Sequence, residues 1–137
     1  SVKPLFTNKP KELKKMPKIF LNDTGLRNSL MNNFVYIENR VDAGELLESA
    51  VFSALWKTIG PLDELYFWRT TGGKEVDFIL QRGSEYIPFE VKVKSGKPNY
   101  LIIFSELYSC KELNIVYLTK TNKVLPKEST LLPVWTL

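Results

Sequence analysis

The chain has 137 residues, of which 44% are hydrophobic and 12% aromatic, and its formal net charge is +4. This length fits one domain with a single core, and no apolar run approaches the roughly 20 residues of a membrane-spanning helix. Its single cysteine, Cys110, excludes an internal disulfide, and its first residues lack the apolar stretch of a signal peptide. We therefore expect a soluble cytoplasmic domain without membrane contact.

The composition also limits the chemistry. Because the chain has no histidine, it can form no Ser-His-Asp triad, no Cys-His pair and no histidine-ligated zinc site. Gly96-Lys97 does not complete a Walker A loop, since Val91 stands where a glycine is required and Pro98 replaces the Ser or Thr. We expect no nucleotide site in this chain, and any catalysis must use carboxylates, lysines or hydroxyls.

The positive charge is concentrated at the N-terminus. Residues 1–18 contain six lysines and one glutamate, a net charge of +5, so the remaining residues sum to −1. Three prolines punctuate residues 1–17, which we interpret as a basic, linker-like arm, whereas residues 18–137 form the folded domain. Such an arm could neutralise nucleic-acid phosphates or be a solvated linker, and the sequence leaves both open.

The first predicted elements after the arm are a strand over KIFLN (18–22) and a helix that begins with Asp23 as N-cap. A second helix is predicted over residues 44–59, with Asp42 and Glu45 as a capping box and Gly60-Pro61 as its end. On its helical periodicity, Glu48 falls at the edge of the apolar stripe, whereas Glu45 points further toward solvent. We therefore predict that Glu48 is half-buried.

Three strands follow over residues 65–70, 75–80 and 86–93, and the short glycine-containing turns between them predict an antiparallel meander. After them we predict a helix over residues 99–110, a buried strand over 114–119 and a final strand at the C-terminus.

Turn geometry fixes the register of the second hairpin. Its paired positions sum to 167, so Asp77 is predicted opposite Glu90, and Glu75 opposite Lys92. Alternation then assigns Asp77, Glu90 and Lys92 to one face of the sheet. It assigns the apolar residues to the other face: Val76, Phe78, Leu80, Phe89, Val91 and Val93.

Two carboxylates directly opposite each other repel by about 3 kcal/mol at ~5 Å and an effective dielectric near 20. A divalent cation between them would reverse the sign, and their hard oxygen ligands suit Mg²⁺ or Mn²⁺. Lys92 could then polarise water or stabilise charge on a phosphate, as in metal-assisted phosphodiester hydrolysis. The alternative is a solvated face on which the lysine simply pairs with the acids.

Five stretches in order resemble a known family: KIFLNDTGL (18–26), GELLESAVF (44–52), GGKEVDFIL (72–80), FEVKVKSGK (89–97) and LLPVW (131–135). They resemble the C-terminal domain of unknown function of prokaryotic AAA-type ATPases, which is similar to the PD-(D/E)xK nucleases. The resemblance implies an α/β, restriction-endonuclease-like fold, with a central mixed β-sheet that contains an antiparallel meander and is flanked by helices. It also implies an ATPase domain upstream of this chain, and DNA as a partner.

The resemblance assigns roles by position. Glu48 becomes the helix acid, Asp77 the principal metal ligand and Glu90 the second ligand. Lys92 becomes the catalytic base or charge stabiliser. The residues implied in addition are Val91, whose carbonyl would be a further metal ligand, and Lys94 and Ser95, which could contact phosphate.

Two functional classes follow from these observations. The first is a Mg²⁺- or Mn²⁺-dependent DNA nuclease, since all four positions of the constellation are present. The second is a non-catalytic module that binds DNA or protein for the ATPase, favoured by the nearly neutral body of the domain. Trp68 pairs with Asp77 if the positions of the first hairpin sum to 145, and we interpret it as a packing residue rather than a base-stacking one.

Overall fold

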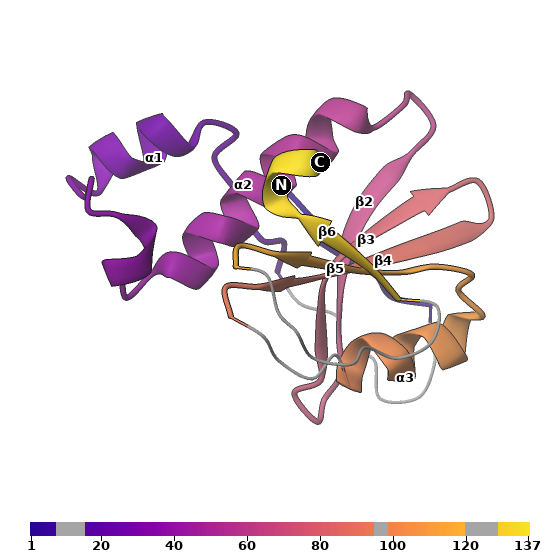
Figure 1. Ribbon diagram of the computed structural model, residues 1–137. Helices are drawn as coiled ribbons and strands as arrows, with labels where there is room; N and C mark the ends of the chain where they lie inside the picture. The colour runs from indigo at the N-terminus through magenta and orange to yellow at the C-terminus, as the bar shows by residue number, and fades with distance from the viewer. Residues whose placement is uncertain (8–15, 95–98, 120–128) are drawn as a thin grey trace.

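The computed structural model describes residues 1–7, 16–94, 99–119 and 129–137, which form one six-stranded sheet flanked by helices (Figure 1). The strands lie in chain order across the sheet. β1 is parallel to β2, β2 to β4 form an antiparallel meander, and β4 to β6 are parallel to one another. Their bounds are β1 (Lys3–Pro4), β2 (Glu64–Arg69), β3 (Glu75–Arg82), β4 (Glu85–Lys92), β5 (Leu113–Tyr117) and β6 (Ser129–Pro133). The predicted central mixed sheet with a meander is confirmed.

The two longest helices cover opposite faces of the sheet. α2 (Ala43–Thr58) contributes Val51, Phe52 and Leu55 to one buried apolar cluster. α3 (Asn99–Tyr108) contributes Leu101 and Phe104 to a second cluster on the other face. The remaining helical elements are α1 (Thr24–Leu30) and the short 3-10 helices η1 (Ile37–Asn39) and η2 (Val134–Thr136). Within the described ranges, no helix combines the length and the apolar character needed to cross a bilayer.

The N-terminal residues belong to the sheet. Val2 and Leu5 are buried in the two apolar clusters, and β1 extends the edge of β2. The strand predicted over residues 18–22 does not form, since only Lys18 of this stretch pairs with another backbone segment, at Val2. Phe20 instead stacks on Phe52 and contacts Phe78, which anchors the residues just before α1.

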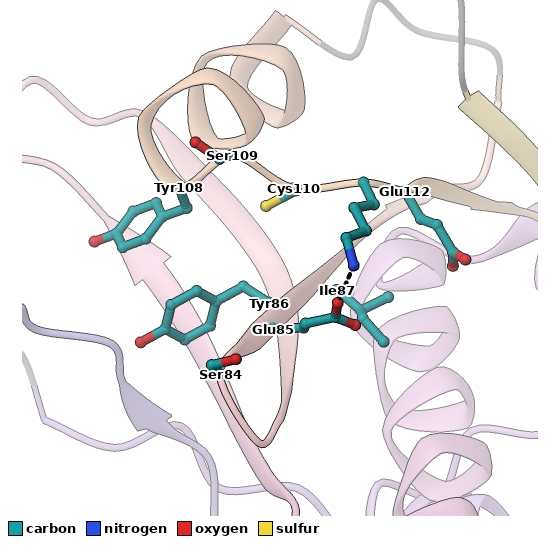
Figure 2. A pocket seen from close by; sticks show the side chains of 9 residues that line it. Ser84, Glu85, Tyr86, Ile87, Tyr108, Ser109, Cys110 and Glu112 are labelled. Atoms are coloured by element: carbon teal, nitrogen blue, oxygen red, sulfur yellow. Dashed lines mark hydrogen bonds and ion pairs between the residues drawn. The ribbon is translucent and has the colours of Figure 1, made fainter.

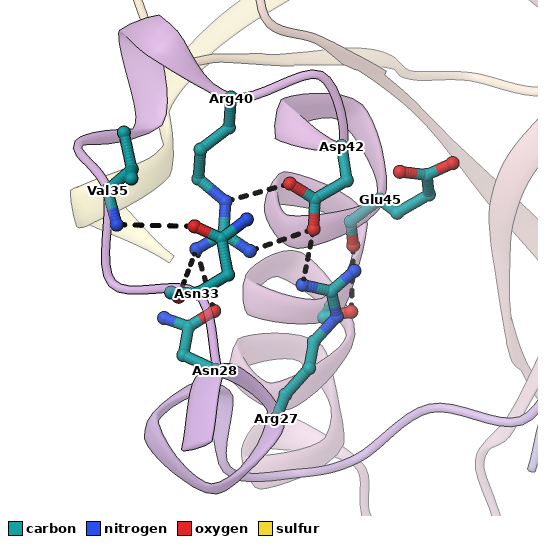
Figure 3. Close-up of polar contacts among 8 residues, drawn as sticks. Arg27, Asn28, Asn33, Val35, Arg40, Asp42 and Glu45 are labelled. Atoms are coloured by element: carbon teal, nitrogen blue, oxygen red, sulfur yellow. Dashed lines mark hydrogen bonds and ion pairs between the residues drawn. The ribbon is translucent and has the colours of Figure 1, made fainter. Parts of the chain in front are cut away.

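The predicted N-cap at Asp23 is confirmed, since its carboxylate accepts a hydrogen bond from the backbone N–H of Leu26 at 2.9 Å. The predicted capping box of α2 is wrong, because the Asp42 side chain makes no capping hydrogen bond. Its carboxylate instead accepts hydrogen bonds from the guanidinium groups of Arg40 and Arg27 (Figure 3). The hydrogen bond from Arg40 is the main reason that the pKa of Asp42 is well below its usual range.

Arg40 connects three segments. Its side chain is buried, and besides binding Asp42 it donates to the Asn28 side chain and to the Asn33 carbonyl (Figure 3). α1 itself contributes no buried residue and lies to one side of the sheet (Figure 1). We infer that this polar cluster, rather than apolar packing, holds α1 against the start of α2.

We therefore expect Arg40→Ala to loosen α1 while leaving the sheet intact. Amide hydrogen exchange in residues 24–33 should accelerate by about tenfold or more, since this segment has little else to hold it. Exchange in β3 and β4, measured in the same experiment, is the internal control. Equal acceleration in the helix and in the strands would contradict the assignment.

Candidate acidic site between β3 and β4

The predicted register of the second hairpin is confirmed from Phe78, which pairs with Phe89, to Arg82, which pairs with Glu85. In the first hairpin, Tyr66 pairs with Ile79 but Trp68 pairs with Val76. One residue of β2 therefore lies opposite two residues of β3, Asp77 and Phe78, which is a β-bulge. Bulges of this kind redirect side chains and are frequent next to active sites.

The bulge corrects two predictions. Trp68 pairs with Val76 and not with Asp77, and it packs edge-on against Phe104 of α3. Val76 joins the apolar cluster under α3 rather than the one under α2 that contains Phe78. The extra residue in β3 breaks the alternation between these two positions, so Asp77 does not follow the simple two-residue period.

The Asp77 carboxylate replaces part of the β3–β4 ladder. Its Oδ2 accepts a hydrogen bond of 2.7 Å from the backbone N–H of Val91, one residue beyond the predicted partner Glu90. From Phe89 onward β4 pairs with β5 on its other side. Asp77 is thus held at the point where β3 and β4 stop pairing, and burial is the main cause that raises its pKa.

Glu90 is the most buried charged residue of the site, with only 6% of its side chain exposed. Its Oε1 accepts a hydrogen bond of 2.5 Å from the ammonium of Lys92, whereas its Oε2 is buried and has no hydrogen-bond partner among the residues that the structure describes. Burial, and then the negative charge of Asp77, raise the pKa of Glu90 to about 7. A buried carboxylate oxygen without a partner is costly, so this oxygen is available to a cation or to a hydrogen-bond donor.

Glu48 of α2 belongs to the same charged group. Its side chain is 28% exposed, which confirms the predicted half-buried position. Burial raises its pKa to about 7, and the charge of Asp77 adds to this effect. Because Asp77 acts on the pKa values of both Glu48 and Glu90, the structure brings the predicted acid of the helix and the two acids of the strands together.

Lys92 faces these acids as predicted. Although burial lowers its pKa, the hydrogen bond with Glu90 and the charges of Glu90, Asp77 and Glu48 outweigh that effect, so its pKa is raised. The ammonium group is therefore charged at neutral pH.

A second lysine, Lys18, was not predicted to belong to the site. Its ammonium lies 2.5 Å from Glu75 Oε1 and 3.7 Å from Glu48 Oε2, and the charge of Asp77 also acts on it. The prediction that Glu75 pairs with Lys92 is wrong. Glu75 lies opposite Arg69 in the first hairpin, and the Nε of Arg69 is 3.3 Å from the Oε2 of Glu75. The signal in the sequence was a lysine at the start of an apolar stretch, two residues before Phe20.

The last two predicted residues add little to the site as described. Lys94 lies two residues after the end of β4 and is exposed. Ser95 lies outside the described residues.

The site fits a hard divalent cation in part. Within the described ranges, no three acidic or cysteine side chains are close enough together to form a ready-made metal site. Mg²⁺, however, usually keeps several waters and binds through only one or two carboxylates. Asp77 and Glu90 supply two such groups, and Glu90 Oε2, which has no partner among the described residues, supplies a buried oxygen that can accept a cation or a donor.

A separate pocket of about 110 Å³ lies between the β3–β4 turn and the end of α3 (Figure 2). An ion pair between Lys111 and Glu85 crosses it, and Cys110 forms part of its wall. None of the predicted site residues that the structure describes lines this pocket, so it is distinct from the acidic site.

The fold and the site define a mixed α/β domain with a buried acidic cluster beside two lysines. Residues 43–137 match the family described as Domain of unknown function (DUF4143), so the chain belongs to this family. It is 31% identical over 91 residues to one uncharacterized protein of Mycobacterium bovis and equally to one of Mycobacterium tuberculosis. Each alignment covers 65% of this chain but 20% of the relative, so the chain spans about a fifth of the length of these relatives. No solved structure matches it significantly.

Proposed function

We propose that this domain is a metal-dependent nuclease of the PD-(D/E)xK type, with a restriction-endonuclease-like fold. The observation that carries the proposal is the buried Glu90 carboxylate, whose Oε2 has no partner in the described part of the chain, with Asp77 near it at the end of the β3–β4 pairing. Burial and like charge raise the pKa of both groups, and such shifted carboxylates are concentrated at functional sites.

In this proposal Asp77, Glu90 and the Val91 carbonyl hold one Mg²⁺ or Mn²⁺ ion. The backbone N–H of Val91 already fixes one oxygen of Asp77, so that its other oxygen is oriented by a rigid strand. When bound, the ion lowers the pKa of its water and stabilises negative charge on a phosphate. The protein orients the ligand carboxylates and partly shields them from solvent.

The two remaining residues divide the other tasks. Because the pKa of Lys92 is raised, its ammonium stays protonated and suits charge stabilisation. Of the two roles that the resemblance implies for Lys92, base or charge stabiliser, we propose the second. Glu48, with a pKa of about 7, can exchange a proton near neutral pH and is the candidate acceptor for the proton of the attacking water.

We further propose DNA as the substrate and an AAA-type ATPase domain as the neighbour in the full-length protein. Relatives about five times as long as the matched region leave room for such a domain. Lys94, which is exposed two residues after the end of β4, and Ser95 would contact the phosphate backbone. Contacts of this kind make binding dependent on salt concentration.

The proposal is tested by thermal melts with and without Mn²⁺. A bound ion should stabilise the parent protein by about 1.4 kcal/mol at ten times the dissociation constant. Asp77→Asn should abolish this gain but keep the hydrogen bond to Val91, because the Asn carbonyl oxygen can accept it. Without metal, removing one of the mutually repelling charges should make Asp77→Asn more stable than the parent, by about 1 to 2 kcal/mol.

The metal site would be refuted if Mn²⁺ does not stabilise the parent protein and Asp77→Asn is less stable than the parent. Glu38→Gln is the matched control, since Glu38 is exposed in η1 and away from the cluster. This variant should keep the full Mn²⁺ effect.

A second candidate, a non-catalytic module that binds DNA or protein for the ATPase, is favoured by one observation. The acids already have cationic partners within the chain, since Lys92 pairs with Glu90, and Lys18 and Arg69 pair with Glu75. These pairs would be sufficient if the cluster were only structural. Melts that show no metal effect would favour this candidate.

A further inference from the structure

Lys18 is anchored through its backbone and through the packing of a residue close to it in sequence. Its backbone N–H and C=O both bond to Val2, at 2.9 and 2.8 Å, and Val2 is fully buried. Two residues later, Phe20 packs between α2 and β3 through Phe52 and Phe78. The backbone position of Lys18 is therefore fixed, which limits the loss of conformational entropy when its side chain pairs with the acids.

The ammonium of Lys18 lies between two elements. It is 2.5 Å from Glu75 of β3 and 3.7 Å from Glu48 of α2, and 5.2 Å from the ring centroid of Phe67. Its side chain is 26% exposed, so solvent screens these contacts only in part. An aromatic face favours a cation at this distance. The chain thus places a permanent positive charge on the α2 side of the acidic cluster.

This position is where a second metal ion would have to bind. In two-metal sites the ions lie about 3.5–4 Å apart and share the carboxylates of the cluster. With one ion at Asp77 and Glu90, the acids left for another are Glu48 and Glu75, and both already contact Lys18. An ammonium group at that point repels a divalent cation and occupies its ligands.

We infer that Lys18 substitutes for a second metal ion, so that the site binds one divalent cation and not two. The inference rests on the proposed function, because it presupposes the ion at Asp77 and Glu90. Lys18 is a positioning residue here: it neutralises Glu48 and Glu75 and thereby leaves Asp77 and Glu90 as the only cation site of the cluster.

The test is the number of Mn²⁺ ions bound per chain, counted from the loss of the free-ion electron paramagnetic resonance signal at protein concentrations above the dissociation constant. The parent should bind one ion. Lys18→Met, which keeps the apolar stem and removes the charge, should bind two, and Lys18→Met combined with Glu48→Gln should bind one again. Arg69→Gln is the matched control, since Arg69 also pairs with Glu75, and it should bind one ion.

The possible failures are distinguishable. Two ions bound by the parent, or a single ion in a folded Lys18→Met, would overturn this inference and leave the proposed function standing. No ion bound by either protein would overturn the proposed function and this inference with it. Circular dichroism reports whether Lys18→Met folds, and Lys18→Gln, which also removes the charge, takes its place in the ion count if it does not.

Discussion

Lys92→Ala is expected to lower DNA cleavage by about 100-fold or more while leaving Mn²⁺ binding intact. The raised pKa of Lys92 keeps its ammonium charged beside Glu90 and Asp77, where negative charge would develop during hydrolysis. Removing one such preorganised donor typically costs about 10² to 10³ in rate. The measurement is the cleavage rate of plasmid and of single-stranded DNA with Mn²⁺.

Two further variants make this result specific. Asp77→Asn should abolish cleavage and Mn²⁺ stabilisation together, because it removes a proposed ligand. Lys57→Ala removes an exposed lysine at the end of α2 and should leave both unchanged. If Lys92→Ala cleaves DNA as fast as the parent does, the ammonium has no part in the chemistry and its pairing with Glu90 is structural.

Local signals in the sequence were sufficient to predict the β3–β4 register and the burial of Glu48. The short glycine turn around Gly83, which has a positive φ of 60°, fixes the register that sets Phe78 opposite Phe89. The period of the apolar residues in α2 was enough to predict that Glu48 is half-buried and that Glu45 is exposed. These features depend on neighbours a few residues apart, so a sequence pattern contains them.

The orientation of Asp77 could not be predicted in this way. EVDFIL has the alternation of a regular strand, yet the bulge opposite Phe67 breaks the period between Val76 and Phe78. Which residue is extra depends on how the sheet packs between α2 and α3, a contact between distant segments. The same holds for Lys18, whose acid partners follow it by 30 and 57 residues.

Asp42 illustrates competition between local and distant contacts. The D-x-x-E pattern at the start of α2 is a sound signature of a capping box. In the structure Arg27 and Arg40 bind both oxygens of the Asp42 carboxylate, and a charged partner is a stronger attraction than a backbone N–H. The pattern locates the helix start correctly and gives the wrong partner for its first acid.

Without metal, the parent protein should lose stability as the pH rises from about 5 to 8. Glu48 and Glu90 have pKa values of about 7 in the folded protein, against an ordinary value of 4.5. Between these values the folded state binds more protons than the unfolded state, so the free energy of unfolding falls with increasing pH. The stabilisation is complete below about pH 4.5 and is lost as the pH passes through 7. We expect a loss on the order of 2 kcal/mol, measured by urea unfolding in the presence of a chelator.

Glu90→Gln should flatten this dependence, because it removes one of the two titrating groups at similar shape. Glu38→Gln, which changes an exposed carboxylate in η1, should keep the slope of the parent. The acids with lowered pKa values, Asp42 and Asp63, act in the opposite direction but only under more acidic conditions, where their carboxylates become protonated.

Added Mn²⁺ should reverse the trend in the parent, since an ion favours the charged carboxylates and binds more tightly as they lose their protons. A parent protein whose stability is constant or rises from pH 5 to 8 in the chelator would mean that Glu90 is already charged and neutralised by Lys92. In that case, no ion is needed to explain the cluster.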